Sequence, residues 1–307
     1  MQVFLSLVFN LLPLYLLIGV GWFAGRFLHV DRQSLGALAI YILMPVTVFG
    51  FVAHLEFQPS FIVLPIVIFT ISAIVGLSFL KLGKKIYGDA QANLMAMCAS
   101  MGNTGYFGLP LVLLFFTQEQ VAIYIFMMLG GSVYEATIGY YMAARGAFDV
   151  RTSLRKIIRF PAIYAIAAGM SANALHLDLP ETFWTYWAYF KGAYVVIGMM
   201  IIGAALSKVQ KLVFGPRFVT LTFSGKFIAF PLLSIAFVVC DNHITHWFNE
   251  NIHNLLIMMS IVPPAANVAA FAAQMNLEPE KAATTILAGT LFALLYIPLI
   301  TWAIGLS

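Results

Sequence analysis

The chain has 307 residues, of which 62% are hydrophobic and only 9% are charged, with a net charge of +4 at pH 7. A soluble domain carries about 25% charged residues, so this composition excludes a soluble globular protein and predicts an all-α integral membrane protein. A transmembrane β-barrel would need short segments of alternating hydrophobicity, whereas the apolar runs here are long and continuous.

Each membrane-spanning helix needs roughly 20 apolar residues, and about ten segments of that length follow one another along the chain. In order they cover 3–25, 34–53, 60–81, 91–116, 119–144, 160–176, 186–206, 218–239, 251–275 and 282–304. The short connections between them leave no room for a sizeable soluble domain. We therefore predict a fold of ten transmembrane helices.

The first segment is expected to be a retained helix, because the N-terminus lacks the basic region of a signal peptide. It contains Gly19, Gly21 and Gly25, and the seventh segment contains Gly198 and Gly203. Small residues let membrane helices approach one another closely. We expect these glycines to serve helix packing.

The fourth and ninth segments are both interrupted in the middle. The first break, residues 102–110, is rich in glycine and ends at Pro110, and the second, residues 263–267, begins with Pro263 and Pro264. Backbone groups that leave the helical hydrogen-bonding pattern inside a bilayer cost several kcal/mol each unless protein, water or ligand supplies a partner. A matched pair of such breaks is typical of the binding site of a transporter.

A half-helix that meets a break carries a partial positive charge at its N-terminal end and a partial negative charge at its C-terminal, carbonyl end. The N-terminal end favours an anionic group, and the carbonyl end suits cations or protons. Asn103 and Asn267 either cap these ends or contact a bound molecule, and the two roles are compatible. The candidate substrate-binding residues are Gly102, Asn103, Thr104, Tyr106, Pro110, Pro263, Pro264 and Asn267.

Charged residues inside the predicted spans are few: Glu135 in the fifth, Lys191 near the start of the seventh and Lys226 in the eighth. A charge at mid-bilayer costs about 2.5–3.5 kcal/mol on insertion scales, so such side chains usually face a cavity or a partner. Glu135 and Lys226 form either a structural ion pair or a site for substrate or proton coupling. Lys191 is expected to reach the outer interface with its ammonium group.

The longest basic connection, residues 146–159, divides the chain into a first set of five helices, 1–145, and a second set, 160–307. Lys and Arg occur in the odd-numbered connections and are absent from the even-numbered ones and the termini. By the positive-inside rule the odd connections are cytoplasmic and both termini lie outside. An odd number of helices per half makes the second half an inverted repeat of the first.

No cofactor or metal site is predicted. His243 and His246 lie close together but lack a third ligand, and they and His253 belong to an outward connection, so we expect surface histidines. No nucleotide-binding loop or catalytic triad spacing occurs, which argues against an enzyme. The coupling ion, if there is one, is expected to be H⁺ or Na⁺.

Several short motifs resemble the auxin efflux carrier family, which comprises plant PIN-type auxin exporters and bacterial relatives often linked to small organic acids such as malonate. The resemblance covers nearly the whole chain. It rests on Pro13-Leu14-Tyr15, Pro45, Asn103-Thr104 followed by Gly108-Leu109-Pro110-Leu111, Arg145-Gly146-Ala147 and the proline-containing break of the ninth segment.

This resemblance implies inverted repeats that cross at the fourth and ninth helices and move as an elevator. Helices one, two, six and seven would form a scaffold, and helices three to five and eight to ten the transport domain. Asn103 would contact a substrate carboxylate, and Pro110 and the Pro263-Pro264 pair would form the crossover. Two features differ from plant members: the third segment has no charge between Phe61 and Leu80, and the sixth begins with Phe160-Pro161-Ala162 instead of an Asn-rich stretch. These differences argue against auxin itself and against a proton site in the third segment.

We therefore expect a secondary active transporter or facilitated carrier of a small organic anion, such as an auxin-like carboxylate or a dicarboxylate, in the inner (plasma) membrane. A sodium-coupled symporter of the bile-acid type and a non-transporting membrane sensor or assembly partner are the alternatives. The expected partners are the organic anion, the lipid bilayer and a second copy bound through the scaffold helices, and not nucleic acid.

Overall fold

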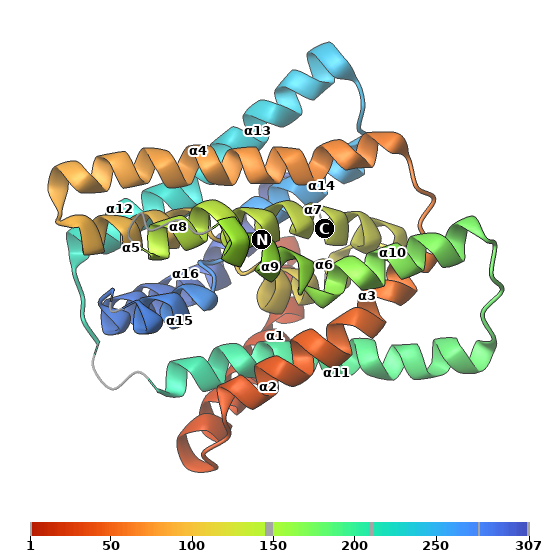
Figure 1. Cartoon of the computed structure of the whole chain (residues 1–307), viewed down its shortest axis with the longest axis horizontal. Coiled ribbons are helices and arrows are strands. Elements are labelled where there is room, and N and C mark those ends of the chain that lie inside the picture. Colours follow the sequence, from red (N-terminus) through yellow and green to blue (C-terminus); the bar gives the residue numbers. More distant parts are fainter. Residues whose placement is uncertain (1, 145–149, 209–211, 276, 306–307) are drawn as a thin grey trace.

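A computed structural model describes residues 2–144, 150–208, 212–275 and 277–305. Within these residues the chain is helical throughout, with no strand longer than an isolated bridge. Long helices run side by side and at angles across the molecule (Figure 1). The Arg145-Gly146-Ala147 motif and residues 146–149 of the predicted connection lie outside the described residues.

The helices in chain order are α1 (Gln2–Phe27), α2 (Arg32–Leu38), η1 (Ala39–Leu43), α3 (Met44–Ala53), η2 (Pro59–Ile62), α4 (Val63–Ile86), α5 (Asp89–Ser100), η3 (Thr104–Gly108), α6 (Leu109–Phe115), α7 (Gln118–Tyr134), η4 (Glu135–Gly139), α8 (Tyr140–Ala143), α9 (Val150–Ile158), α10 (Pro161–Ala174), α11 (Glu181–Ser207), α12 (Pro216–Phe223), η5 (Ser224–Ala229), α13 (Phe230–Cys240), η6 (Asp241–Thr245), α14 (Glu250–Ser260), α15 (Asn267–Gln274) and α16 (Pro279–Ala303). Local sequence explains several starts. Pro161, Pro216 and Pro279 open α10, α12 and α16, where a missing N–H costs nothing. Thr117 and Gln120 form a capping box before α7.

Six continuous helical stretches in the described part of the chain are long and apolar enough to cross a membrane. They are Arg32–Ala53, Pro59–Ile86, Gln118–Ala143, Glu181–Ser207, Pro216–Thr245 and Pro279–Ala303. They agree with the second, third, fifth, seventh, eighth and tenth predicted segments and confirm a helical membrane protein. The other four segments are also helical, but α10 has only 14 residues and two are broken, so the count of ten spans stays a prediction.

Glycines bring α1 and α11 into backbone contact. A Cβ atom at Gly203 would overlap the Ile18 carbonyl oxygen, and one at Gly21 would overlap the backbone of Met200. Gly19, by contrast, faces open space. The packing role expected for these glycines therefore applies to Gly21, Gly203 and Gly25, whose added Cβ would overlap the Ser207 hydroxyl, and not to Gly19.

Several long helices contain a single π-helical turn. Two of these turns carry charged residues: the half-buried Glu135 begins η4, and the buried Lys226 lies within η5. A π turn inside an α-helix is often found at a functional site, because it redirects side chains and frees backbone groups. The two charges singled out by the sequence thus lie where the helices are locally distorted.

Candidate functional site at the crossing helix breaks

Both predicted breaks exist, and they are joined to each other by backbone hydrogen bonds. α5 ends at Ser100 and α14 ends at Ser260, and the chains between them and the next helices run antiparallel. Asn103 N–H donates to Pro263 O (2.8 Å), and Ala265 N–H donates to Met101 O (2.9 Å). Each break therefore satisfies backbone groups of the other at a depth where water is scarce.

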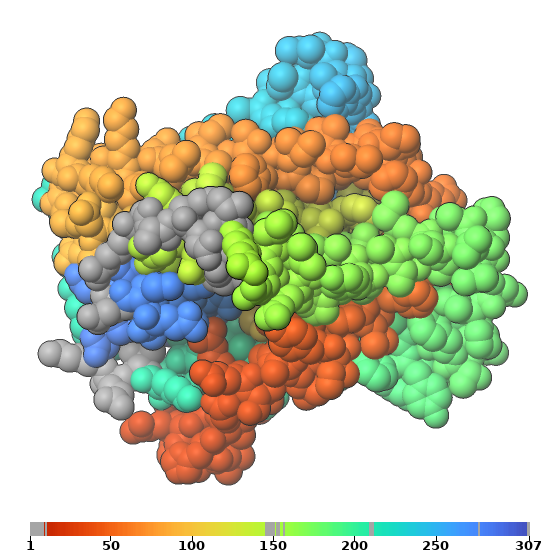
Figure 2. Space-filling view, viewed as in Figure 1, coloured from red at the N-terminus to blue at the C-terminus, as the bar shows by residue number. Residues whose placement is uncertain are grey.

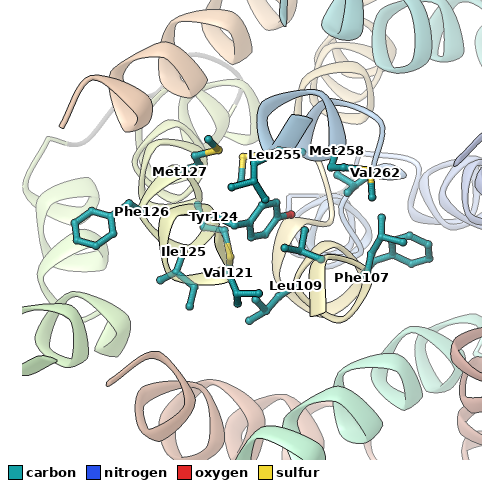
Figure 3. Close-up of a cluster of buried hydrophobic side chains, with 14 of the residues drawn as sticks. Phe107, Leu109, Val121, Tyr124, Ile125, Phe126, Met127, Leu255, Met258 and Val262 are labelled. Carbon is teal, nitrogen blue, oxygen red and sulfur yellow. The ribbon is translucent and has the colours of Figure 1, made fainter. Parts of the chain in front are cut away.

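A buried apolar cluster holds the two broken segments against α7. Its centre is Tyr124 of α7, whose hydroxyl donates to Thr104 O at 3.2 Å. In Figure 3 side chains of the first broken segment, of α7 and of the second broken segment surround this ring: Phe107, Leu109, Val121, Leu255, Met258 and Val262. A Cβ atom at Gly108 would overlap the Tyr124 hydroxyl. The glycine at this position lets the break lie directly on α7.

A cavity of about 550 Å³ lies at the crossing. Residues of both breaks line it, together with η1, α7, η4, α10 and α11, and its wall includes the apolar side chains Met44, Leu129, Phe160 and Phe271. Its polar lining comes from Asn103, Thr104, Tyr106, Ser132, Glu135, Arg155, Arg159, Tyr194 and Asn267. The volume suits a small molecule with one apolar part and a few polar groups.

The side-chain amide of Asn103 has no hydrogen-bond partner among the residues that the structure describes. The residue is 4% exposed, and among the described residues no acceptor lies within hydrogen-bonding distance of its Nδ2. Its backbone groups are both occupied, since N–H binds Pro263 O and the carbonyl accepts from Gly108 N–H at 2.9 Å. A buried amide donor left without a partner costs about 1–3 kcal/mol. Asn103 thus combines an unpaired buried donor with a position in the lining of the cavity.

Asn267, the second asparagine, contacts Glu135. Its Nδ2 donates to Glu135 Oε1 at 3.1 Å, and this bond joins the start of α15 to the π turn η4. Both side chains line the same cavity as Asn103. The expected position of Asn267 at the end of a broken helix holds, and its contact with Glu135 could not be read from the spacing of the two residues.

Lys226 does not line the large cavity. It is fully buried; its Nζ donates to Ser260 O at 3.3 Å and lies 4.3 Å from the centre of the Phe230 ring. Lys226 and Glu135 both line a small cavity of about 40 Å³ behind the break. The two charges therefore share one cavity, with Asn267 and Ser260 as their hydrogen-bond partners there.

Three arginines surround the large cavity. Arg155 and Arg159 line it with exposed side chains, and Arg32 Nη2 donates to Ala266 O at 3.3 Å, at the start of α15. The sequence analysis used these residues only for topology and missed their place at the site. The basic residues of the segment that forms α9, the short helix that carries Arg155, were visible in the sequence and could have suggested an anion site. Figure 2 shows this segment in bright green at the surface, between α4 and the α2–α3 helix.

The structure brings most of the predicted site residues together. Six of them line the large cavity: Gly102, Asn103, Thr104, Tyr106, Glu135 and Asn267. The others, Pro110, Pro263, Pro264 and Lys226, do not line it, and the prolines serve the break itself: Pro110 lies in the first turn of α6, and Pro263 accepts the Asn103 N–H. Tyr194, Ser132 and the Phe160-Pro161 pair are lining residues that the sequence analysis did not propose.

The remaining predicted polar residues have structural roles. Lys191 places its ammonium 4.6 Å from the Trp187 ring. No group of three metal-ligating side chains occurs in the described part of the chain. His253 does not have the surface position expected for it: it is 5% exposed, and its Nε2 lies 2.9 Å from Asp241 Oδ2. Asp241 also accepts the Phe248 N–H at 3.1 Å, so this pair anchors the turn between η6 and α14.

Comparisons with known proteins place the chain among membrane transport proteins. The model of a family described as membrane transport protein matches residues 6–301. An uncharacterized transporter of Methanocaldococcus jannaschii is 27% identical over 303 residues, which cover 94% of this chain and 95% of that protein. With the six long apolar helices, these matches identify a multi-pass membrane protein. The chain belongs to the membrane transport protein family, the auxin efflux carrier family that its interrupted helices resemble.

Proposed function

We propose that this protein carries a small organic anion across the membrane, with a carboxylate of the substrate bound to Asn103 in the cavity at the crossing. The observation that carries the proposal is the Asn103 amide, a buried donor without a partner among the described residues that faces a cavity of about 550 Å³. A carboxylate is an acceptor only, and its hydrogen bonds to such donors are stronger than those of a neutral acceptor.

The charges around the cavity support an anion over a cation. Arg155 and Arg159 line it with exposed side chains, and exposed positive charges at a cavity raise the local concentration of anions. By the positive-inside rule these arginines are cytoplasmic, so the cavity opens to the cytoplasm in this conformation. The apolar wall, which includes Met44 and Phe160, suits the hydrocarbon part of an organic acid better than a fully hydrated inorganic anion.

The proposed mechanism is an elevator in a ten-helix fold of two inverted repeats, with both termini outside the cytoplasm. In this mechanism α1, α2–α3, α10 and α11 form the scaffold, which is supported by the tight packing of α1 on α11 and of α3 on α10 and α11. The transport domain contains both breaks and the helices that enclose them. The backbone bonds between the breaks favour a rigid unit that moves with its cargo.

The coupling ion is a separate part of the proposal. Glu135 accepts from Asn267 at the cavity wall, so its protonation would change a contact that joins the two halves of the site. We propose H⁺ coupling through this residue. Uptake by Glu135→Gln in proteoliposomes should no longer respond to a pH gradient; a response equal to that of the wild type would remove Glu135 from the mechanism.

The experiment for the main proposal compares carboxylates with their amides. Purified protein is screened by thermal shift against mono-, di- and indole carboxylates and the matched neutral amides, and the ligands that bind are then tested for uptake into proteoliposomes. A carboxylate should raise Tm and enter the vesicles saturably, and its amide should do neither. Binding without uptake would favour a sensor, and stabilisation by amides as strong as by acids would contradict an anion site.

A further inference from the structure

The ammonium of Lys226 lies where the carbonyl ends of the two broken helices meet. It donates to Ser260 O, the carbonyl of the last residue of α14, at 3.3 Å. On the other side, a Cβ atom added at Gly102, two residues after the end of α5, would lie 3.0 Å from Lys226 Nζ. The side chain is fully buried on its π turn.

The surroundings of this ammonium group resemble those of a bound monovalent cation. The C-terminal end of each half-helix carries about half a negative charge, and in transporters with broken helices such ends and unwound carbonyls coordinate Na⁺. The small cavity beside Lys226 is lined by the hydroxyl-bearing residues Ser72, Ser100 and Tyr134 and by Glu135. Oxygen atoms of this kind are the ligands that hard cations take.

We infer that Lys226 is a tethered cation that occupies the cation position of the crossing, so that this carrier needs no Na⁺. This inference rests on the proposed function, because the cation position belongs to the same crossing. The ligand it concerns is a monovalent cation and not the organic anion. Removal of the ammonium leaves the Ser260 carbonyl and the nearby oxygen atoms without their positive charge. A Na⁺ ion then binds there.

A purely structural role for Lys226 makes a different prediction. In that case the ammonium serves only to pack over the Phe230 ring, 4.3 Å away, and to bind one carbonyl. Its loss would lower stability equally in every salt. Dependence of the variant on the identity of the cation therefore separates the two roles.

The test measures Tm of the full-length protein in detergent with NaCl, KCl or choline chloride at one ionic strength. The variants are Lys226→Ala, Lys226→Gln and the conservative Lys226→Arg, and Lys191→Ala is the matched control because its ammonium also lies over an aromatic ring, that of Trp187. Lys226→Ala and Lys226→Gln should show a saturable rise in Tm of roughly 2–4 °C with Na⁺ over choline. The wild type, Lys226→Arg and Lys191→Ala should show no difference.

Other outcomes overturn the inference. A Na⁺-dependent Tm in the wild type would mean that Lys226 does not fill the position, and equal Tm values in Na⁺ and choline for both neutral variants would mean that the position binds no cation. If the neutral variants fold only when they are purified in Na⁺, the inference is supported; if they fail in every salt, the ammonium is a packing element. No substrate enters this assay, so its result is independent of whether the protein carries a carboxylate.

Discussion

Replacement of Asn103 by alanine separates a binding role from a structural one. In the free protein its Nδ2 is a buried donor that binds no described residue, while its backbone N–H and carbonyl hold the crossing. Asn103→Ala keeps those backbone bonds and removes the amide. A hydrogen bond to a charged acceptor contributes about 1.5–3 kcal/mol, so the Kd for the bound carboxylate should rise about 10- to 150-fold.

The stability of the free protein provides the second half of this test. Because the removed donor makes no bond within the described residues, Tm of ligand-free Asn103→Ala should stay at or above that of the wild type. The matched control is Asn173→Ala, whose Nδ2 donates to Ala53 O at 2.9 Å, outside the cavity. This control should lower Tm and leave the Kd unchanged. Isothermal titration and thermal melts measure both quantities, and an unchanged Kd in Asn103→Ala would refute the proposed contact.

Three further predictions concern the rim of the cavity and the packing around it. Replacing both Arg155 and Arg159 by glutamine should slow anion association at low salt, and the difference from the wild type should fade as ionic strength rises, because salt screens exposed charges; stopped-flow binding measures both. Gly203→Ala should destabilise the protein by about 1–3 kcal/mol, since its Cβ would overlap the backbone of α1, and Gly19→Ala, in open space, should leave Tm unchanged. Asp241→Asn turns one acceptor oxygen into an amide nitrogen and should cost about 1–3 kcal/mol through one orphaned buried N–H group; chemical unfolding gives the value.

The sequence was informative where a physical rule forces a residue type. Glycine and proline inside an apolar segment predict a break, and the matching positions of the two breaks predicted that they cross. Both points are confirmed by the bonds between 101–103 and 263–265. Asn103 could also be singled out from the sequence, because an asparagine inside an apolar segment is costly unless its amide is hydrogen-bonded. In the structure this residue lines the cavity.

The partners of the buried charges were not predictable in the same way. Sequence left open whether Glu135 pairs with Lys226 or serves coupling, and its hydrogen bond to Asn267 depends on how two helices far apart in the sequence rotate about their axes. Glu135 begins a π turn, and Lys226 lies within another, and no residue pattern marks these turns. His253 was assigned to the surface because it lies in or beside an outward connection, whereas in the structure it is buried against Asp241.

The arginines show a different limit of sequence reasoning. Their distribution was used only to orient the chain in the membrane, and the fold then places Arg155 and Arg159 at the cavity. In the proposed mechanism, one set of charges serves two purposes. The second purpose depends on the chain from α9 to α10 lying against the crossing, which tertiary packing decides.

The most direct measurement of the central claim is protection of the cavity by a bound carboxylate. Ser132 lines both the large and the small cavity, so Ser132→Cys places a thiol beside the proposed anion with little change in volume. Cys240 is replaced by serine because it is exposed, and Cys98 is kept because it is buried. The rate of modification by an anionic thiol reagent is then measured with and without ligand. A saturating carboxylate, and not its amide, should slow this reaction at least severalfold; an unchanged rate would mean that the anion binds elsewhere.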